Sequence, residues 1–172
     1  MENLSARRIL RTGRLAARPR DAWFLVLAAA VVGLDQLTKW LIRDSLDRGD
    51  VTFDIGILKI VHIVNTGAAF GMLQNAGPLL AVTSLIGMLA IFVYLFNPGF
   101  AHPLMRLGLA LMLGGAIGNL IDRVSNGEVV DFIKVPHWWA FNVADSAITV
   151  GVVVLLWTML QDHSTEASDA NS

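Results

Sequence analysis

Four long runs of apolar residues divide the chain, and each is close to the length that a membrane-spanning helix needs. They occupy residues 22–42, 77–96, 104–121 and 142–160. A helix crosses the hydrocarbon layer with about 20 mostly apolar residues. The pattern therefore predicts four transmembrane helices, with longer polar segments after the first run and after the third.

The first run is the least uniform of the four. It begins AWFLVLAAAVVGL and then includes Asp35, Gln36 and Lys39. Together with the basic residues before it, the stretch 1–34 also has the layout of a secretory signal peptide. Apolar residues nevertheless continue through Ile42 at helical spacing, which favours a span that stays in the mature protein.

Alternating apolar and polar residues predict short strands in the first polar segment. Apolar side chains take the odd positions over 51–57, and the pattern then moves to the even positions, with Leu58, Ile60, His62 and Val64. The change of phase beside Gly56 predicts a bend or bulge between two strands. In the later segment, the dipeptide Asn126-Gly127 predicts a hairpin turn. We expect a small sheet on the outer face of the helices.

Composition supports a membrane protein. Of the 172 residues, 55% are hydrophobic and 16% are charged, and the mean hydropathy is +0.59. A soluble domain carries about a quarter charged residues. The net charge of −1 gives no reason to expect a nucleic-acid partner. The absence of cysteine excludes disulfides and thiolate sites, and the four histidines lack paired spacing, so we expect no metal or other cofactor.

Basic residues before the first run predict the orientation of the chain. They are Arg7, Arg8, Arg11, Arg14, Arg18 and Arg20. Positive charge collects on the cytoplasmic side, so the N-terminus should be cytoplasmic, and four spans return the C-terminus to the same side.

This orientation also predicts how the chain is organised. A basic cytoplasmic extension covers 1–21, and the four-span region covers 22–161. The segments 43–76 and 122–141 are then extracytoplasmic. The tail at 162–172 is polar and lacks Lys and Arg, which predicts a disordered cytoplasmic segment.

Two aspartates stand where a carboxylate is costly. Asp131 lies in a strand-like run, on the face that it shares with Val129 and Ile133, and Asp145 begins the last apolar run. Because Asp145 follows Asn142 by three residues, one interpretation is helix capping. The other is that the intervening loop brings the two carboxylates together. Two close carboxylates cannot both ionise easily, so one keeps a proton while the other activates water, as in aspartic hydrolases.

Further polar side chains lie near the outer ends of the first and third runs. Asp35 and Lys39 are spaced as an ion pair in the favourable order. The pair is either structural, with Lys39 snorkelling to the outer surface, or it faces a site there. Asn119, Asp122 and Arg123 end the third run. Either Asp122 and Arg123 neutralise each other, or Arg123 holds a substrate carbonyl or a lipid headgroup.

Two other positions have a plainer interpretation as structural residues. Asn65 and Gly67 follow the second predicted strand and fit a turn. Ser146 fits the first turn of a helix, and no serine lies in a GxSxG setting, so a serine nucleophile is poorly supported.

Five successive motifs resemble those of the bacterial lipoprotein signal peptidases, the type II signal peptidases. They are DQLTK, NTGAAF, GGAIGNLIDR, VVDF and FNVADSAI, in the family's order and over residues 33–150. The resemblance implies an all-α membrane protein with four transmembrane helices and a small extracytoplasmic β-cradle. It places the chain in the bacterial cytoplasmic membrane, with the active site at the extracytoplasmic face.

The resemblance also implies an aspartic endopeptidase that cleaves prolipoproteins before a diacylglyceryl-modified cysteine. The catalytic pair is then Asp131 and Asp145. Supporting or substrate-binding roles fall to the matching positions Asn65, Gly67, Asn119, Arg123, Asn142, Asp35 and Lys39. The expected partners are diacylglyceryl prolipoproteins and membrane lipids, and we expect a monomer.

Two other classes of function remain open at this point. A small transporter would use Asp35 and Lys39 as coupling groups, although the polar residues lie at outer ends and no internal repeat pairs the two halves. A non-catalytic lipoprotein-binding or assembly factor would use Asp131 and Asp145 only as structural groups. Binding without turnover by the purified protein would favour that last class.

Overall fold

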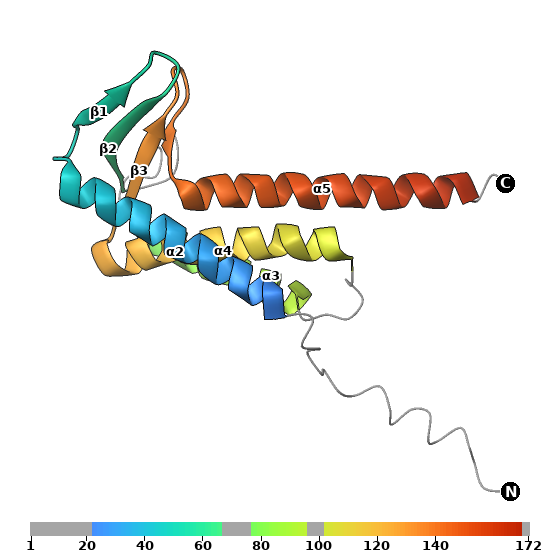
Figure 1. The fold of residues 1–172 in the computed structure, drawn as a ribbon. Coiled ribbons are helices and arrows are strands. Elements are labelled where there is room, and N and C mark those ends of the chain that lie inside the picture. The colour runs from blue at the N-terminus through green and yellow to red at the C-terminus, as the bar shows by residue number, and fades with distance from the viewer. Residues whose placement is uncertain (1–21, 67–76, 96–101, 170–172) are drawn as a thin grey trace, which may run out of the picture.

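A computed structural model describes residues 22–66, 77–95 and 102–169 of the chain. Helices lie beside one another, and an antiparallel sheet stands at one end of them (Figure 1). The described elements are α2 (Ala22–Ser45), β1 (Val51–Asp54), β2 (Lys59–Asn65), α3 (Gly77–Leu95), α4 (Pro103–Asn126), β3 (Val129–Lys134), β4 (Ala140–Phe141) and α5 (Val143–Asp169). Gly67 and the six arginines before α2 lie outside the described residues.

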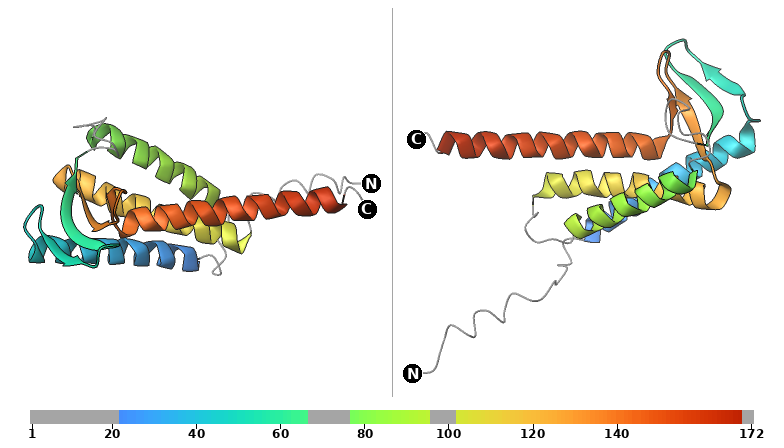
Figure 2. Two further views of the ribbon diagram at one scale, coloured as in Figure 1. Left: turned by 90° about the horizontal axis from the view of Figure 1, so that it is seen from above. Right: turned by 180° about the vertical axis from the view of Figure 1, so that it is seen from behind.

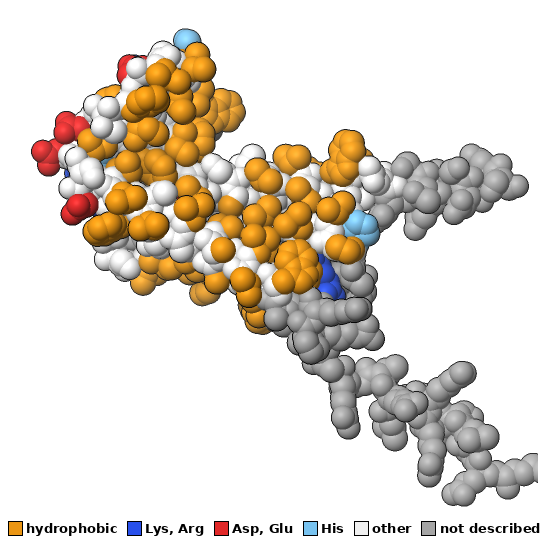
Figure 3. All heavy atoms as spheres, viewed as in Figure 1, with side chains coloured by type: hydrophobic (Ala, Val, Ile, Leu, Met, Phe, Trp, Pro, Cys, Tyr) orange, Lys and Arg blue, Asp and Glu red, His pale blue; other side chains and the backbone are white. Residues whose placement is uncertain are grey.

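Three helices in the described part of the chain are long and apolar enough to cross a membrane. These stretches are Trp23–Ser45 in α2, Pro103–Asn126 in α4 and Val143–Gln161 in α5. Helix α3 has 19 residues, and the apolar stretch within its described side chains is Ser84–Tyr94. Hydrophobic side chains cover much of the visible surface of the helices (Figure 3). The mostly helical membrane architecture with a small sheet is confirmed, while α3 as a fourth span stays a prediction.

Helix α4 packs between the other helices, and glycines on two of its faces make the close approach possible (Figure 2). A Cβ atom on Gly114 would lie 2.7 Å from the carbonyl oxygen of Ala28 in α2. A Cβ atom on Gly115 would collide with the carbonyl oxygen of Ala144 in α5. Small residues let helix backbones meet in this way, and Gly114 and Gly118 have the small-xxx-small spacing that is typical of such contacts. The core cluster beside these contacts consists of Phe24, Ala28, Leu109, Ala110 and Leu113.

The sheet places its strands across the direction of α5 (Figure 1). Its strand order is β1-β2-β3-β4, and all neighbours are antiparallel. The two strands expected around Gly56 are confirmed, with Gly56 in the turn at φ 81° and a register shift between Val51 and Phe53. In the pairing of β2 with β3, Ile63 lies opposite Asp131. Ile133 pairs with Phe141, so β4 delivers the chain directly to α5.

The hairpin predicted at Asn126-Gly127 is wrong. Helix α4 continues through Asn126, and Gly127 caps it in the left-handed conformation at φ 74°. The Gly127 N–H donates to the carbonyl oxygen of Arg123 at 3.1 Å. An Asn-Gly pair suits both a type I′ hairpin turn and a helix C-cap, because both need a positive φ.

The last helix is longer than the apolar pattern predicted. Helix α5 ends at Asp169, so residues 162–169 are helical where we expected a disordered tail. The segment DHSTEASD contains neither Gly nor Pro to end the helix.

Candidate active site

Asp131 and Asp145 come together where the sheet meets the first turn of α5. Asp131 lies on β3 and is 2% exposed, and Asp145 is the third residue of α5. Asn142 contacts both carboxylates. Its Nδ2 donates to Asp131 Oδ1 at 2.8 Å, and its backbone N–H donates to Asp145 Oδ2 at 3.3 Å. The short path through β4 thus makes one asparagine the link between the two acids.

The capping interpretation of Asp145 is confirmed and does not compete with a site. Asn142 Oδ1 accepts from the backbone N–H of Asp145 at 2.9 Å, while the Asp145 carboxylate accepts from the N–H of Asn142. This is a reciprocal capping box. The other carboxylate oxygen, Oδ1, accepts from Asn119 Nδ2 at 2.7 Å. The cap therefore fixes the orientation of the carboxylate that the site presents.

The surroundings of Asp131 favour its protonated form. Burial raises the pKa of Asp131 to about 7, and the negative charge of Asp145 acts in the same direction. Hydrogen bonds from Asn65 and Asn142 lower this pKa and only partly offset the rise. The Asn65 bond joins Nδ2 to Asp131 Oδ2 at 3.0 Å. At neutral pH, Asp131 is therefore suited to hold a proton.

Lys39 lies inside the protein beneath the pair and does not snorkel. Its side chain is fully buried, with Nζ 2.8 Å from Asp35 Oδ2 and 2.9 Å from Asp122 Oδ2. Nζ also donates to Asn119 Oδ1 at 2.9 Å. Three buried acceptors bind the ammonium group inside the protein, so the side chain does not extend to the outer surface. The expectation that Lys39 snorkels was therefore wrong.

Asp122 pairs across helices and not with its neighbour Arg123. In addition to Lys39, Asp122 accepts from Arg43 Nη2 at 2.8 Å. Adjacent residues on a helix point in different directions, so Arg123 is free to face another surface. Arg43 was not singled out from the sequence, although it continues the spacing of Asp35 and Lys39 along one helix face.

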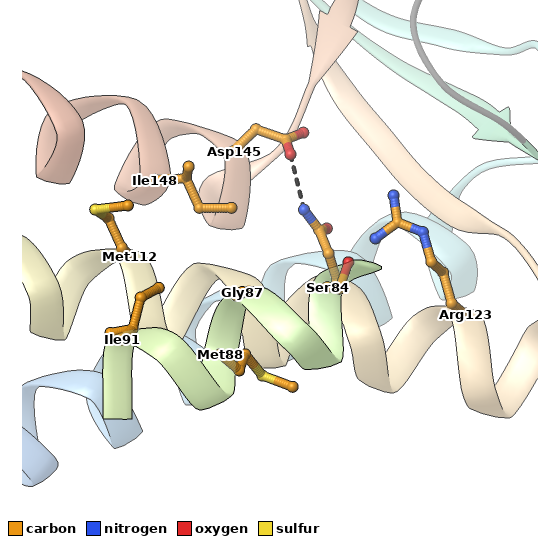
Figure 4. Close-up of a pocket in the computed structure, with 10 residues that line it drawn as sticks. Ser84, Gly87, Met88, Ile91, Met112, Arg123, Asp145 and Ile148 are labelled. Atoms are coloured by element: carbon orange, nitrogen blue, oxygen red, sulfur yellow. Dashed lines mark hydrogen bonds between the residues drawn. The ribbon is translucent and has the colours of Figure 1, made fainter. Parts of the chain in front are cut away.

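A pocket of about 290 Å³ opens between α3, α4 and α5 (Figure 4). The side chains of Arg123 and Asp145 lie at one end of it, and Asn119 joins Asp145 there by the hydrogen bond drawn in Figure 4. The remainder is mostly apolar and is lined by Met88, Ile91, Met112, Ala116 and Ile148, with Ser84 and Gly87. Such a pocket suits an amphiphile whose polar part reaches the carboxylates.

The structure thus brings most of the predicted site residues together. Direct contacts with the two carboxylates come from Asn65, Asn119 and Asn142. Arg123 stands at the pocket end, and Asp35 and Lys39 lie behind Asn119.

The chain matches known proteins over most of its length. Residues 27–161 match the family model for signal peptidase (SPase) II. The lipoprotein signal peptidase of Moorella thermoacetica is 44% identical over 139 residues, covering 80% of this chain and 92% of that protein. That of Syntrophotalea carbinolica is 45% identical over 148 residues, covering 80% and 91%.

Solved structures agree with the sequence relatives. The solved structure of a bacterial membrane enzyme is 33% identical, with a TM-score of 0.79, and covers 84% of this chain and 91% of that chain. A second solved bacterial membrane enzyme, also 33% identical, gives a TM-score of 0.75. The chain belongs to the signal peptidase II family and is a membrane peptidase.

Proposed function

We propose that this chain is an aspartic endopeptidase that removes signal peptides from prolipoproteins by cleaving before a diacylglyceryl-modified cysteine. Family membership and the names of the relatives support the substrate. The observation that supports the aspartic mechanism is the joining of Asp131 and Asp145 through Asn142 beside a pocket with an apolar floor.

The two carboxylates have different surroundings and therefore different roles. Asp145 lines the pocket, where it meets water and substrate as the general base. Asp131, whose pKa is raised to about 7, is the general acid. As the water oxygen attacks the scissile carbonyl carbon, Asp145 takes a proton from water and Asp131 gives its proton to the carbonyl oxygen. When the carbon–nitrogen bond breaks, Asp145 returns its proton to the leaving amine and Asp131 recovers its own.

The pocket also suits the position of such a substrate in a membrane. Its apolar residues lie along α3, α4 and α5, and its polar end lies at the first turn of α5, beside the sheet. A diacylglyceryl group or an apolar signal-peptide segment would stay among the helices while the scissile bond reaches the acids. On this basis the sheet lies at the extracytoplasmic face of the bacterial cytoplasmic membrane, and both termini are cytoplasmic.

Arg123 serves to bind substrate and not to activate water. Its guanidinium stays protonated and offers several donors, which fits a backbone carbonyl close to the acids. Asn119 donates to Asp145 and has no basic group of its own. The mechanism requires neither a metal nor another cofactor, and a single copy of the chain supplies every residue that it uses.

The test is cleavage of a diacylglyceryl-cysteine prolipoprotein by the purified protein. We expect Asp131→Asn and Asp145→Asn each to abolish release of the signal peptide, because an amide can neither accept nor donate the required proton. Asp47→Asn, at an exposed position outside the site, is the matched control and should cleave normally. Chelators should have no effect, and strong inhibition by EDTA would point to a metal and contradict the mechanism. Binding without turnover by the wild type would favour the assembly factor instead.

Arg123→Ala separates substrate binding from proton transfer. Loss of one charged hydrogen bond costs about 1.5–3 kcal/mol, or roughly a 10- to 150-fold loss in kcat/KM. Residual cleavage should therefore be measurable for Arg123→Ala and absent for Asp145→Asn, when both are compared per folded molecule. If Asp145→Asn retains as much cleavage as Arg123→Ala, Asp145 is only a helix cap and not the general base.

A further inference from the structure

Lys39 is a buried cation that the proposed mechanism does not use. Its side chain is fully buried, and its nearest partners are two carboxylates and the side-chain oxygen of Asn119. It does not line the substrate pocket, yet only Asn119 separates it from Asp145.

Lys39 determines which way the Asn119 amide faces. Asn119 Oδ1 accepts from Lys39 Nζ at 2.9 Å and from Asn142 Nδ2 at 3.2 Å. An ammonium group has no acceptor, so only the oxygen of the amide can face it. The amide NH₂ is then left on the opposite side, where Nδ2 donates to Asp145 Oδ1 at 2.7 Å.

The same lysine also ties α2 to the start of α5. Its partner Asp35 accepts from the backbone N–H of Ala144 through Oδ1 at 2.9 Å. A carboxylate is favourable in the first turn of a helix, because the N–H groups there have no partner within the helix. A Cβ atom on Gly118 would lie 2.6 Å from Asp35 Oδ2, so the absence of a side chain on Gly118 leaves room for this carboxylate.

We propose that Lys39 is a positioning residue for catalysis, which holds the Asn119 amide so that it donates to Asp145 and holds the first turn of α5 through Asp35. This proposal rests on the aspartic mechanism given above. Without Lys39, the Asn119 amide gains freedom to turn its oxygen toward the Asp145 carboxylate, which repels it. The carboxylate then loses the donor to its Oδ1, although the capping bond to its Oδ2 and the substrate pocket are unchanged.

A kinetic comparison separates positioning from mere structural support. We expect Lys39→Met to lower kcat per folded molecule by about 10- to 100-fold, the loss of one charged hydrogen bond, with KM within a factor of about two. Lys39 also lowers the pKa of Asp131 through its charge. The alkaline limb of the pH profile should therefore move to higher pH in the variant. A purely structural lysine would reduce the amount of folded protein and leave kcat, KM and the pH profile of the remainder unchanged.

Two further variants keep the test decisive if the single variant folds poorly. In Asp35→Asn with Lys39→Met, one positive and one negative charge are removed together, and the new amide can still accept from Ala144. In Asn119→Asp, Lys39 keeps an acceptor, but the side chain can no longer donate to Asp145. Both should show the loss of kcat. Arg48→Gln, which breaks only the pair with Glu128 at the surface, is the matched control and should behave as wild type.

The outcomes distinguish this inference from the proposed function. If wild type cleaves and Asp145→Asn does not, the aspartic mechanism stands. In that case, wild-type kcat in the charge-balanced variant or in Asn119→Asp would overturn the positioning role of Lys39. If Asp145→Asn itself cleaves the substrate, the aspartic mechanism is contradicted, and the positioning role of Lys39 that rests on it is contradicted as well.

Discussion

Asp131 and Asp145 each accept hydrogen bonds from asparagine side chains or backbone, but only one of them faces the pocket. Asp131 is 2% exposed and held between Asn65 and Asn142 on the sheet. Asp145 lines the pocket and is held by the start of its own helix and by Asn119. The buried acid is thus suited to keep a proton, and the accessible one to act on water.

The first prediction concerns pH. With the pKa of Asp131 raised to about 7, kcat/KM should fall as pH rises through that value, because the pair loses the proton that the general acid donates. Asn65→Ala removes a hydrogen bond that lowers this pKa. The pKa should therefore rise further, and the alkaline limb of the kcat/KM profile should move to higher pH. An unchanged or more acidic limb would exclude Asp131 as the group that titrates.

The same shift has a consequence for stability with a definite sign. Folding raises the pKa of Asp131 from 3.8 to about 7, so the folded state binds an extra proton between these values. The contribution of Asp131 to the free energy of unfolding is complete below the lower value. It decreases as pH rises through the window to about 7.

At the scale of residues, the catalytic candidates could be predicted because a carboxylate in an apolar run costs free energy and therefore often marks a functional site. The full burial of Lys39 and the part played by Arg43 could not be predicted in this way. Both depend on α2 and α4 meeting at Asp122, a contact between distant segments that no local pattern contains.

At the scale of elements, α4 holds the site together because its glycines let α2 and α5 come close. The face with Gly114 meets α2, and the face with Gly115 meets α5 at the turn that bears Asp145. The spacing of Gly114 and Gly118 in the sequence is typical of close helix packing, but it does not identify the partner helices. Helix ends were harder to predict, since Asn126-Gly127 suits a cap as well as a hairpin.

The second prediction tests this packing. A Cβ atom in Gly115→Ala would collide with the backbone oxygen of Ala144, and overpacking of this kind costs about 1–3 kcal/mol. Gly33→Ala is the matched control, because nothing lies within 4 Å of its Cβ position. In thermal unfolding of the detergent-purified variants, Gly115→Ala should lower Tm and Gly33→Ala should preserve or raise it. Equal Tm values would mean that α4 and α5 can move apart at this contact without a loss of stability.

At the scale of the whole molecule, the direction of the helices bears on the number of membrane spans. Helices α2 and α4 both lead into strands of the sheet, so both end on the side of the membrane where the sheet lies (Figure 1). If both helices cross the membrane, the chain must return to the opposite side between β2 and the start of α4. Helix α3 is the described element in that interval. Its side chains Leu85, Ile86 and Leu89 are 58–64% exposed, as expected for a helix that faces lipid.

The last prediction follows from this argument and concerns topology. If α3 crosses the membrane, the chain has four spans, and a reporter fused after Ser172 should be active only when it is of a kind that works in the cytoplasm. The same reporters inserted in the turn at Gly56, between β1 and β2, should give the opposite result, because the sheet lies at the other face. The six N-terminal arginines predict that the face opposite the sheet is cytoplasmic. Signals on the same side from both positions would mean an odd number of spans. Because α2 and α4 both end at the sheet, the chain would still have to return to the opposite side between them, so that result would mean that α5, which begins at the sheet, does not cross the membrane.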